Sequence, residues 1–138
     1  MLEGKTFQQQ LGISNDMMQE FYEAAQSYLS DGQYQEASDC FLFLLVLNPL
    51  ESTLWIQSGH ASRFLGDPNE ALQAYSMAMF SDPDDPFPHY WAALVYIDQK
   101  QYEQARCCRE ICLRLIDEQS AYMPLKELAQ ALTIEGTK

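Results

Sequence analysis

The sequence predicts an all-α protein built from tandem helical hairpins, and three observations support this. Residues of the same type recur 34 positions apart, as Gly32 with Gly66 and Pro49 with Pro83 do. Apolar residues between these breaks follow the spacing of an amphipathic helix. No stretch alternates apolar and polar residues with the two-residue period of a strand. Together these patterns favour repeated pairs of helices stacked around an apolar core.

Three units of 34 residues fit the period, at residues 18–51, 52–85 and 86–119. We expect a single domain over residues 1–138, with an N-terminal segment at 1–17 and a C-terminal capping helix at 120–138. One hairpin cannot bury both of its apolar sides, so neighbouring hairpins must stack. Stacking of this kind predicts a curved superhelix whose inner wall is built from the first helix of each unit.

Turn and capping residues set the expected bounds of the helices. Ser14-Asn15-Asp16 supplies an N-cap for the first helix, and Asp31-Gly32 ends it because glycine accepts the left-handed conformation. Three further helix ends are expected at Asn48-Pro49, Gly66-Asp67 and Asp82-Pro83. The expected helices cover residues 17–29, 34–47, 52–65, 68–81, 86–98, 102–116 and 121–133.

The composition excludes several classes of partner. Eight Lys and Arg stand against 20 Asp and Glu, which gives a formal net charge of -12. Nucleic acids and anionic membrane surfaces both require clustered basic residues, so we expect the chain to bind neither. The longest apolar run, Phe41 to Leu47, is far shorter than the roughly 20 residues of a membrane helix. The N-terminus lacks the pattern of a secretory signal, so we expect a cytoplasmic protein without direct membrane insertion.

No residues are spaced for catalysis or metal binding. We expect four free thiols in a reducing cytosol, at Cys40, Cys107, Cys108 and Cys112, since the last three share about one and a half helical turns. Cys112 takes the period position of Leu44 and Ala78, which predicts a core residue. His60 and His89 lie in other units, so we predict no metal and no cofactor. Without a Gly-rich phosphate loop or an oriented nucleophile, we expect no enzyme.

The 34-residue period resembles the tetratricopeptide repeat. In the middle unit the matching residues are Trp55, Gly59, Ala71, Tyr75, Ala78 and Pro83. The third unit departs from the pattern, because Arg109 stands at the position of Phe41 and Tyr75, and Asp117 replaces the closing proline. The resemblance implies small residues where the two helices cross and large residues in the gap between them.

Helical spacing then predicts which residues face the inner wall. The expected groove residues are Tyr22, Gln26, Leu29, Ile56, His60, Arg63, Phe64, Phe87, Tyr90, Leu94 and Ile97. A wall rich in aromatic and aliphatic side chains is typical of a surface that binds an extended peptide or a partner helix. The alternative is that Phe87, Tyr90 and Leu94 pack under the terminal helix instead.

A second resemblance narrows the function. The segment Pro83-Asp84-Asp85-Pro86-Phe87-Pro88-His89-Tyr90-Trp91-Ala92-Ala93 is similar to the proline-rich entry to the third repeat of class II type III secretion chaperones. The resemblance covers roughly residues 13 to 133. It implies a cytosolic chaperone of a Gram-negative bacterium that holds an extended apolar segment of hydrophobic translocator proteins in its groove and keeps them soluble. Gln26 and Leu29 depart from the family's frequent aromatic residues, which alters the expected first pocket.

Two other functions use the same kind of groove. One is a regulatory adaptor that binds a transcription factor or a secretion-apparatus component, since secretion regulators are partners in the family as well. The other captures an acidic C-terminal tail, which requires cationic inner positions, and only Arg63 is cationic there. We therefore exclude the second. The resemblance also implies a homodimer through N-terminal helices, but residues 1–16 are short and Gln-rich, so the oligomeric state is left open.

The acidic residues are unevenly placed. Residues 1–85 hold 2 Lys and Arg and 13 Asp and Glu, a balance of 2 − 13 = −11, whereas residues 86–138 hold 6 and 7, a balance of −1. One interpretation is a solvated outer face that keeps the chaperone soluble beside an apolar ligand. The sharper hypothesis is that basic residues flanking the client's apolar anchors are steered to the first two repeats.

Overall fold

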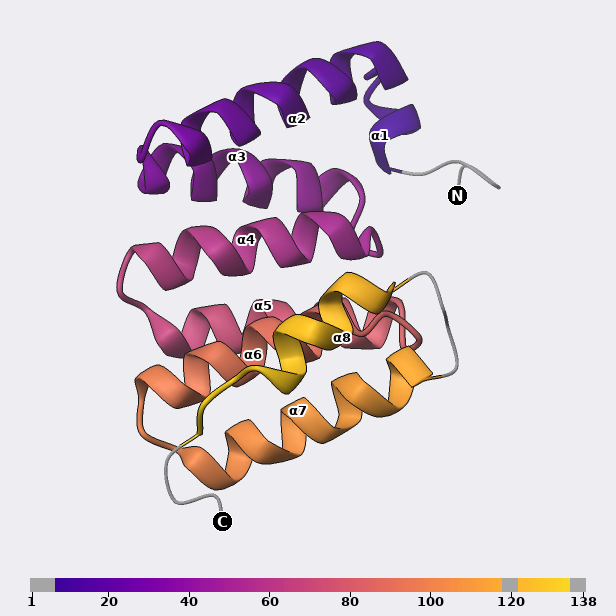
Figure 1. The fold of residues 1–138 in the computed structure, drawn as a ribbon. Helices are drawn as coiled ribbons and strands as arrows, with labels where there is room; N and C mark the ends of the chain where they lie inside the picture. Colours follow the sequence, from indigo (N-terminus) through magenta and orange to yellow (C-terminus); the bar gives the residue numbers. More distant parts are fainter. Residues whose placement is uncertain (1–6, 118–121, 135–138) are drawn as a thin grey trace. The chain divides into compact units, whose positions relative to one another are not determined.

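The structure, a computed structural model, describes residues 7–117 and 122–134, and these residues form helices without any strand. The elements in chain order are α1 (Phe7–Gln10), α2 (Asn15–Ser30), α3 (Tyr34–Leu47), α4 (Ser52–Phe64), α5 (Pro68–Ser81), α6 (Phe87–Asp98), α7 (Tyr102–Asp117) and α8 (Met123–Gln130) (Figure 1). The prediction of an all-α fold made of helical hairpins is confirmed.

The predicted caps and turns form as the residue types require. Ser14 caps α2, because its Oγ accepts a hydrogen bond from the Met17 amide at 3.1 Å. Gly32 and Gly66 both take the left-handed conformation, at φ 80° and 82°, and each ends the first helix of a hairpin. Lys100, one period later, takes the same conformation at φ 61° although it is not glycine. The 34-residue period is therefore a period of backbone geometry as well as of sequence.

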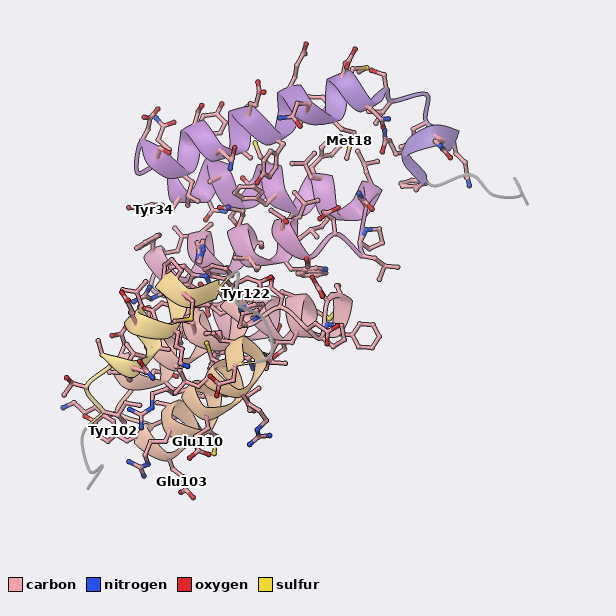
Figure 2. The ribbon with its side chains drawn as sticks, turned by 45° about the vertical axis from the view of Figure 1, so that its right-hand side comes forward. Met18, Tyr34, Tyr102, Glu103, Glu110 and Tyr122 are labelled. Carbon is pink, nitrogen blue, oxygen red and sulfur yellow. The ribbon has the colours of Figure 1, made fainter. Side chains whose placement is uncertain are left out.

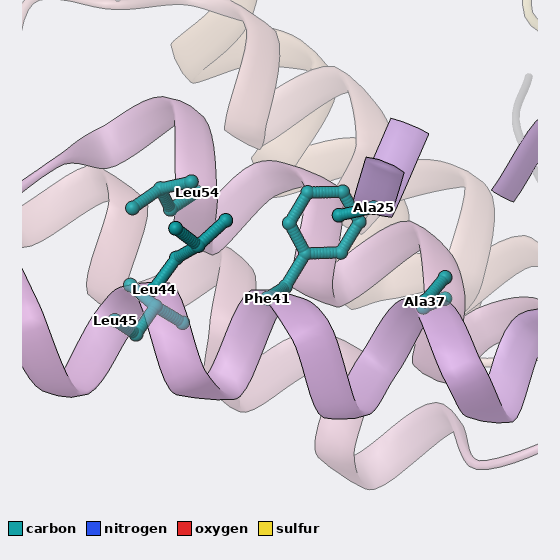
Figure 3. Close-up of a cluster of buried hydrophobic side chains, with 7 residues drawn as sticks. Ala25, Ala37, Phe41, Leu44, Leu45 and Leu54 are labelled. Atoms are coloured by element: carbon teal, nitrogen blue, oxygen red, sulfur yellow. The ribbon is translucent and has the colours of Figure 1, made fainter. Parts of the chain in front are cut away.

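The chain divides into two compact units, Met1–Ala74 and Tyr75–Lys138, and the division falls within α5. In the first unit, α2, α3 and α4 run antiparallel to one another in succession (Figure 1). Their shared core consists of Ala25, Ala37, Phe41, Leu44, Leu45, Leu54 and Ala61. The Phe41 ring points toward Ala25, so a large residue fills the space that a small one leaves (Figure 3). This is the small-against-large packing that the repeat pattern implies.

The second unit has its own core beneath α8. The cluster contains Tyr90 from α6, Cys112 and Ile116 from α7, and Leu125 and Ala129 from α8. Cys112 is fully buried, as its period position predicts. The Cys112 and Ile116 face of α7 corresponds, one period on, to the side of α5 that carries Ala78. Here α8 covers that face, which prevents it from meeting water at the end of the repeats.

The C-terminal helix is shorter than the expected span of 121–133. It ends at Gln130, and residue 121 lies outside the described residues. The Leu132 carbonyl instead accepts a hydrogen bond from Arg109 Nη1 at 3.3 Å, while the Leu132 amide bonds to the Ala129 carbonyl. A tertiary contact from α7 thus replaces the next helical turn, which local helix propensity alone does not reveal.

Candidate functional site

The groove residues predicted on α2 and α4 lie within the first unit and can be described together. Tyr22, Leu29 and Ile56 are half-buried, whereas Gln26 is exposed. Tyr22 and Leu29 pack against the edge of the core, and the Tyr22 ring meets Phe41 edge to face at 6.3 Å. Their remaining surface faces solvent, so this side of the first hairpin offers apolar area on a rigid support.

Tyr22 is the best-fixed member of this set. Its hydroxyl accepts a hydrogen bond from Gln26 Nε2 at 3.1 Å and also bonds to the Gln57 side chain on α4. Burial raises the pKa of the phenol and the nearby Glu51 carboxylate raises it further, while the bonds to Gln57 and Gln26 act in the opposite direction. At neutral pH the group is therefore a neutral phenol that joins α2 to α4.

A pocket of about 310 Å³ opens beside Tyr22, between the first half of α2 and the start of α4. We call it the Tyr22 pocket, and its walls are Asn15, Met18, Gln19, Tyr22, Leu44, Asn48, Glu51, Thr53 and Leu54. Figure 2 marks Met18, which packs against the core from α2. Sequence reasoning placed only Tyr22 here. The α2 members stand one to two helical turns before it, at 15, 18 and 19, so extending the same spacing toward the N-terminus would have found them.

The far end of α4 holds the three remaining predicted residues of this unit. Burial, and then the Arg63 charge, lower the pKa of His60 to about 4, so His60 is neutral at physiological pH. Phe64 is 54% exposed and its ring stacks on Tyr34 at 5.0 Å. Arg63 lies with Cζ 6.0 Å from the Phe64 ring centroid. The exposed side of the Phe64 ring is therefore apolar area on a fixed support, which a partner can cover.

The groove residues predicted on α6 lie in the second unit. Tyr90 is buried in the core there, and Leu94 packs against the same cluster under α8. Phe87 keeps 36% of its surface exposed, and its ring meets Tyr122, which Figure 2 labels at the start of α8, edge to face at 5.8 Å. Ile97 is half-buried. Packing under the terminal helix, the alternative drawn from the sequence, thus accounts for Tyr90 and Leu94 as this structure places them.

The described residues offer little for chemistry. None of the four cysteines forms a disulfide, and burial raises the pKa of both Cys108 and Cys112 to about 11, with smaller contributions from neighbouring groups. Such thiols stay protonated and are poor nucleophiles. Across residues 7–117 and 122–134, no group of three or more His, Cys, Asp or Glu is placed to hold a metal ion. In the same residues no helix has the length and apolar character to cross a membrane.

Known proteins share this fold. No family model matches the chain. The low calcium response locus protein H of Yersinia pestis is 23% identical over 113 residues, which cover 82% of this chain and 67% of that protein. The type III secretion translocator chaperone SycD of Yersinia enterocolitica matches with a TM-score of 0.88 at 22% identity, over 93% of this chain and 96% of SycD. The chain has the fold of a type III secretion translocator chaperone.

Two further structures carry the same fold. A chain of the CopN–Scc3 complex matches with a TM-score of 0.85 at 25% identity, over 94% of this chain and 76% of that one. SycD in complex with a peptide of the translocator YopD matches with a TM-score of 0.80 at 22% identity, over 86% of this chain and 91% of SycD. The translocator-chaperone fold therefore exists in these relatives both alone and with a bound peptide.

Proposed function

We propose that this protein is a cytoplasmic chaperone that binds an extended apolar segment of a hydrophobic translocator protein of a type III secretion system. The segment lies along the predicted groove residues, and the chaperone keeps its client soluble until secretion. The observation that carries the proposal is the exposed aromatic surface of Phe64 on α4, in a chain with the fold of SycD, which binds a YopD peptide. The protein acts by binding and not as an enzyme.

The physical basis is the surface that the first unit leaves open. Tyr22, Leu29, Ile56 and Phe64 each keep apolar area in contact with water while their backbone is held by packed helices. Covering such area contributes roughly 25 cal/mol per Å². Because the helices are already ordered, little conformational entropy is lost on the chaperone side. A membrane-active client gains most, since its own exposed apolar segments would otherwise aggregate in the cytosol.

In the second unit the proposal assigns different roles to the four predicted residues. Phe87 and Ile97 offer partly exposed apolar surface to the client. Tyr90 and Leu94 stabilise the position of α6, because their side chains are already packed with α7 and α8. We therefore expect substitutions at Phe87 and Ile97 to affect client binding, and substitutions at Tyr90 and Leu94 to affect stability first.

Co-expression tests the function directly. We expect translocator candidates from the same genome to be soluble and intact with this chain, and insoluble or degraded without it. Phe64→Asp should abolish the effect and leave the helical circular dichroism unchanged. Phe80→Asp is the matched control, since Phe80 is 73% exposed and lies outside the predicted groove. Equal client solubility with and without the chaperone would refute the proposal, and capture of a transcription factor instead would favour a regulatory adaptor.

A further inference from the structure

We propose that the Tyr22 pocket receives a lysine or arginine side chain of the client, next to the apolar anchors of the same segment. The inference depends on the proposed function in one respect, which is that the side chain comes from a translocator client. The pocket itself, with its walls of mixed polarity, belongs wholly to the first unit. The ligand class is therefore an alkyl stem that ends in a cation.

The shape of the pocket suits a long side chain with a polar end. Met18, Tyr22, Leu44 and Leu54 form apolar walls, and Leu44 and Leu54 are almost completely buried. A methylene stem can lie against these walls while its charged head stays near water, as lysine and arginine stems do elsewhere. A volume of about 310 Å³ accommodates one such side chain.

The charge of the pocket comes from Glu51. This residue stands at the N-cap of α4, yet its side chain makes no capping hydrogen bond. Its backbone carbonyl accepts bonds from the amides of Leu54 and Trp55, which fixes the start of α4. Trp55 Nε1 also donates to the Pro49 carbonyl at 2.7 Å and so holds the turn that carries Glu51. The carboxylate is thus positioned by the backbone and remains available to a ligand.

In the described part of the first unit, Glu51 has no nearby Lys or Arg side chain with which to form an ion pair. Residues 7–74 contain one Lys or Arg and nine Asp or Glu, a balance of 1 − 9 = −8. The single cation is Arg63, twelve residues along the same helix, which is about 18 Å away at the rise of an α-helix. Glu51 makes no ion pair among the described residues. A cationic ligand therefore meets a negative field without displacing an internal partner.

The polar walls disfavour a purely apolar occupant. Asn15, Gln19, Asn48 and Thr53 line the pocket together with Glu51, and all of them offer oxygen acceptors. An aliphatic side chain would take water from these groups without giving hydrogen bonds in return, and an unpaired carboxylate is the costliest of them to desolvate. A guanidinium or ammonium group donates to these oxygen acceptors and also carries the charge opposite to that of the Glu51 carboxylate, which is the one wall group that can only accept.

Small capped amino acids test the pocket without any client. We would titrate the purified full chain with N-acetyl-arginine amide and follow NMR shifts of the Met18 methyl and the Thr53 amide. N-acetyl-citrulline amide is the neutral isostere, and N-acetyl-norleucine amide is the apolar probe. We expect saturable shifts with the arginine probe and roughly fivefold weaker binding of citrulline. Added salt should weaken only the arginine probe.

Two variants test whether the Glu51 carboxylate is the charge that binds the arginine probe. Glu51→Gln should bring arginine binding down to the citrulline level. Glu36→Gln, which removes an exposed carboxylate from α3 outside the pocket, should leave it unchanged. Equal binding of arginine and citrulline to the native chain, or stronger binding of norleucine, would overturn the inference even if Glu51→Gln proved unstable. Failure of the co-expression test with preserved arginine binding would refute the chaperone function and leave the pocket intact.

Discussion

Gln26 Nε2 donates a hydrogen bond to the Tyr22 hydroxyl at 3.1 Å, one helical turn away on α2. On its other side the Tyr22 ring packs against Phe41 in the core. The phenol is therefore held in one orientation at the wall of the pocket. A side chain fixed in this way loses little rotamer freedom when a ligand covers it, so it is well suited as a contact in a preformed groove.

Removing the Tyr22 hydroxyl while keeping the ring distinguishes the effect of its hydrogen bonds from the effect of ring packing. We expect Tyr22→Phe to lower the free energy of unfolding by about 1 kcal/mol, because the bonds to Gln26 and Gln57 are lost while the ring remains. Chemical denaturation measures the loss. Tyr22→Asp should cost far more, since it deletes the ring contact with Phe41 and adds a charge near Glu51. If both variants lose the same stability, the ring does not support the core as described.

His60 makes stability depend on pH. The pKa of His60 in the folded state, about 4, lies below the ordinary value of 6.5. Between these two pH values the imidazole is protonated in the unfolded chain and neutral in the folded chain. Stability should therefore fall as the pH drops from about 6.5 to about 4, by at most about 3 kcal/mol. Denaturation curves of the native chain and His60→Gln should diverge across this window. If the stability of the two proteins changed with pH in the same way, the lowered pKa of His60 would be contradicted. A His60 NMR titration centred near pH 6.5 would contradict it as well.

Lys100 occupies a left-handed position that glycine fills in the other two hairpins. Lys100→Gly should stabilise the fold by about 0.5–1 kcal/mol, because a side chain at positive φ carries a steric cost that glycine avoids. Gly66→Ala should have the opposite effect, about 1 kcal/mol of destabilisation, although open space surrounds the position where its Cβ would be. Urea denaturation compares the pair. A loss of stability in Lys100→Gly would show that the lysine side chain contributes contacts that outweigh the strain.

Arg109 holds the segment that follows α8 through the Leu132 carbonyl. We expect Arg109→Ala to destabilise the protein by about 1–2 kcal/mol and to speed hydrogen exchange of the α8 amides before those of α6 and α7. Arg114→Ala is the matched control, since Arg114 is exposed on the same helix. Unchanged exchange in α8 would mean that this bond does not anchor the terminal segment.

The period of 34 residues was enough to predict the helices and much of the core. Cys112 and Ala78 could be placed in the interior because a repeated unit repeats its packing. The departures were less predictable. Arg109, which replaces an aromatic residue, bonds to a carbonyl 23 positions later, and Lys100 adopts a glycine conformation. Both depend on tertiary context that no local pattern encodes.

The candidate site was only partly predictable. Spacing along each first helix predicted Tyr22 and Phe64 as groove residues, and both keep part of their surface exposed. Spacing alone could not decide whether Tyr90 and Leu94 face the groove or pack under α8, where this structure places them. It also missed Glu51 and Asn48, because both lie at the turn between two helices and carry no helical periodicity. The uneven charge along the chain is the one feature that points toward this pocket, since acidic residues concentrate in the part of the chain where it lies.

Photo-crosslinking in the co-expressed complex tests the central claim most directly. Phe64→p-benzoylphenylalanine places a reactive group on the proposed groove, and Phe80→p-benzoylphenylalanine places the same group on an exposed site outside it. We predict an adduct from position 64 to one apolar segment of the translocator, with a basic residue nearby, and no adduct from position 80. Adducts from position 80 with none from position 64 would contradict the groove.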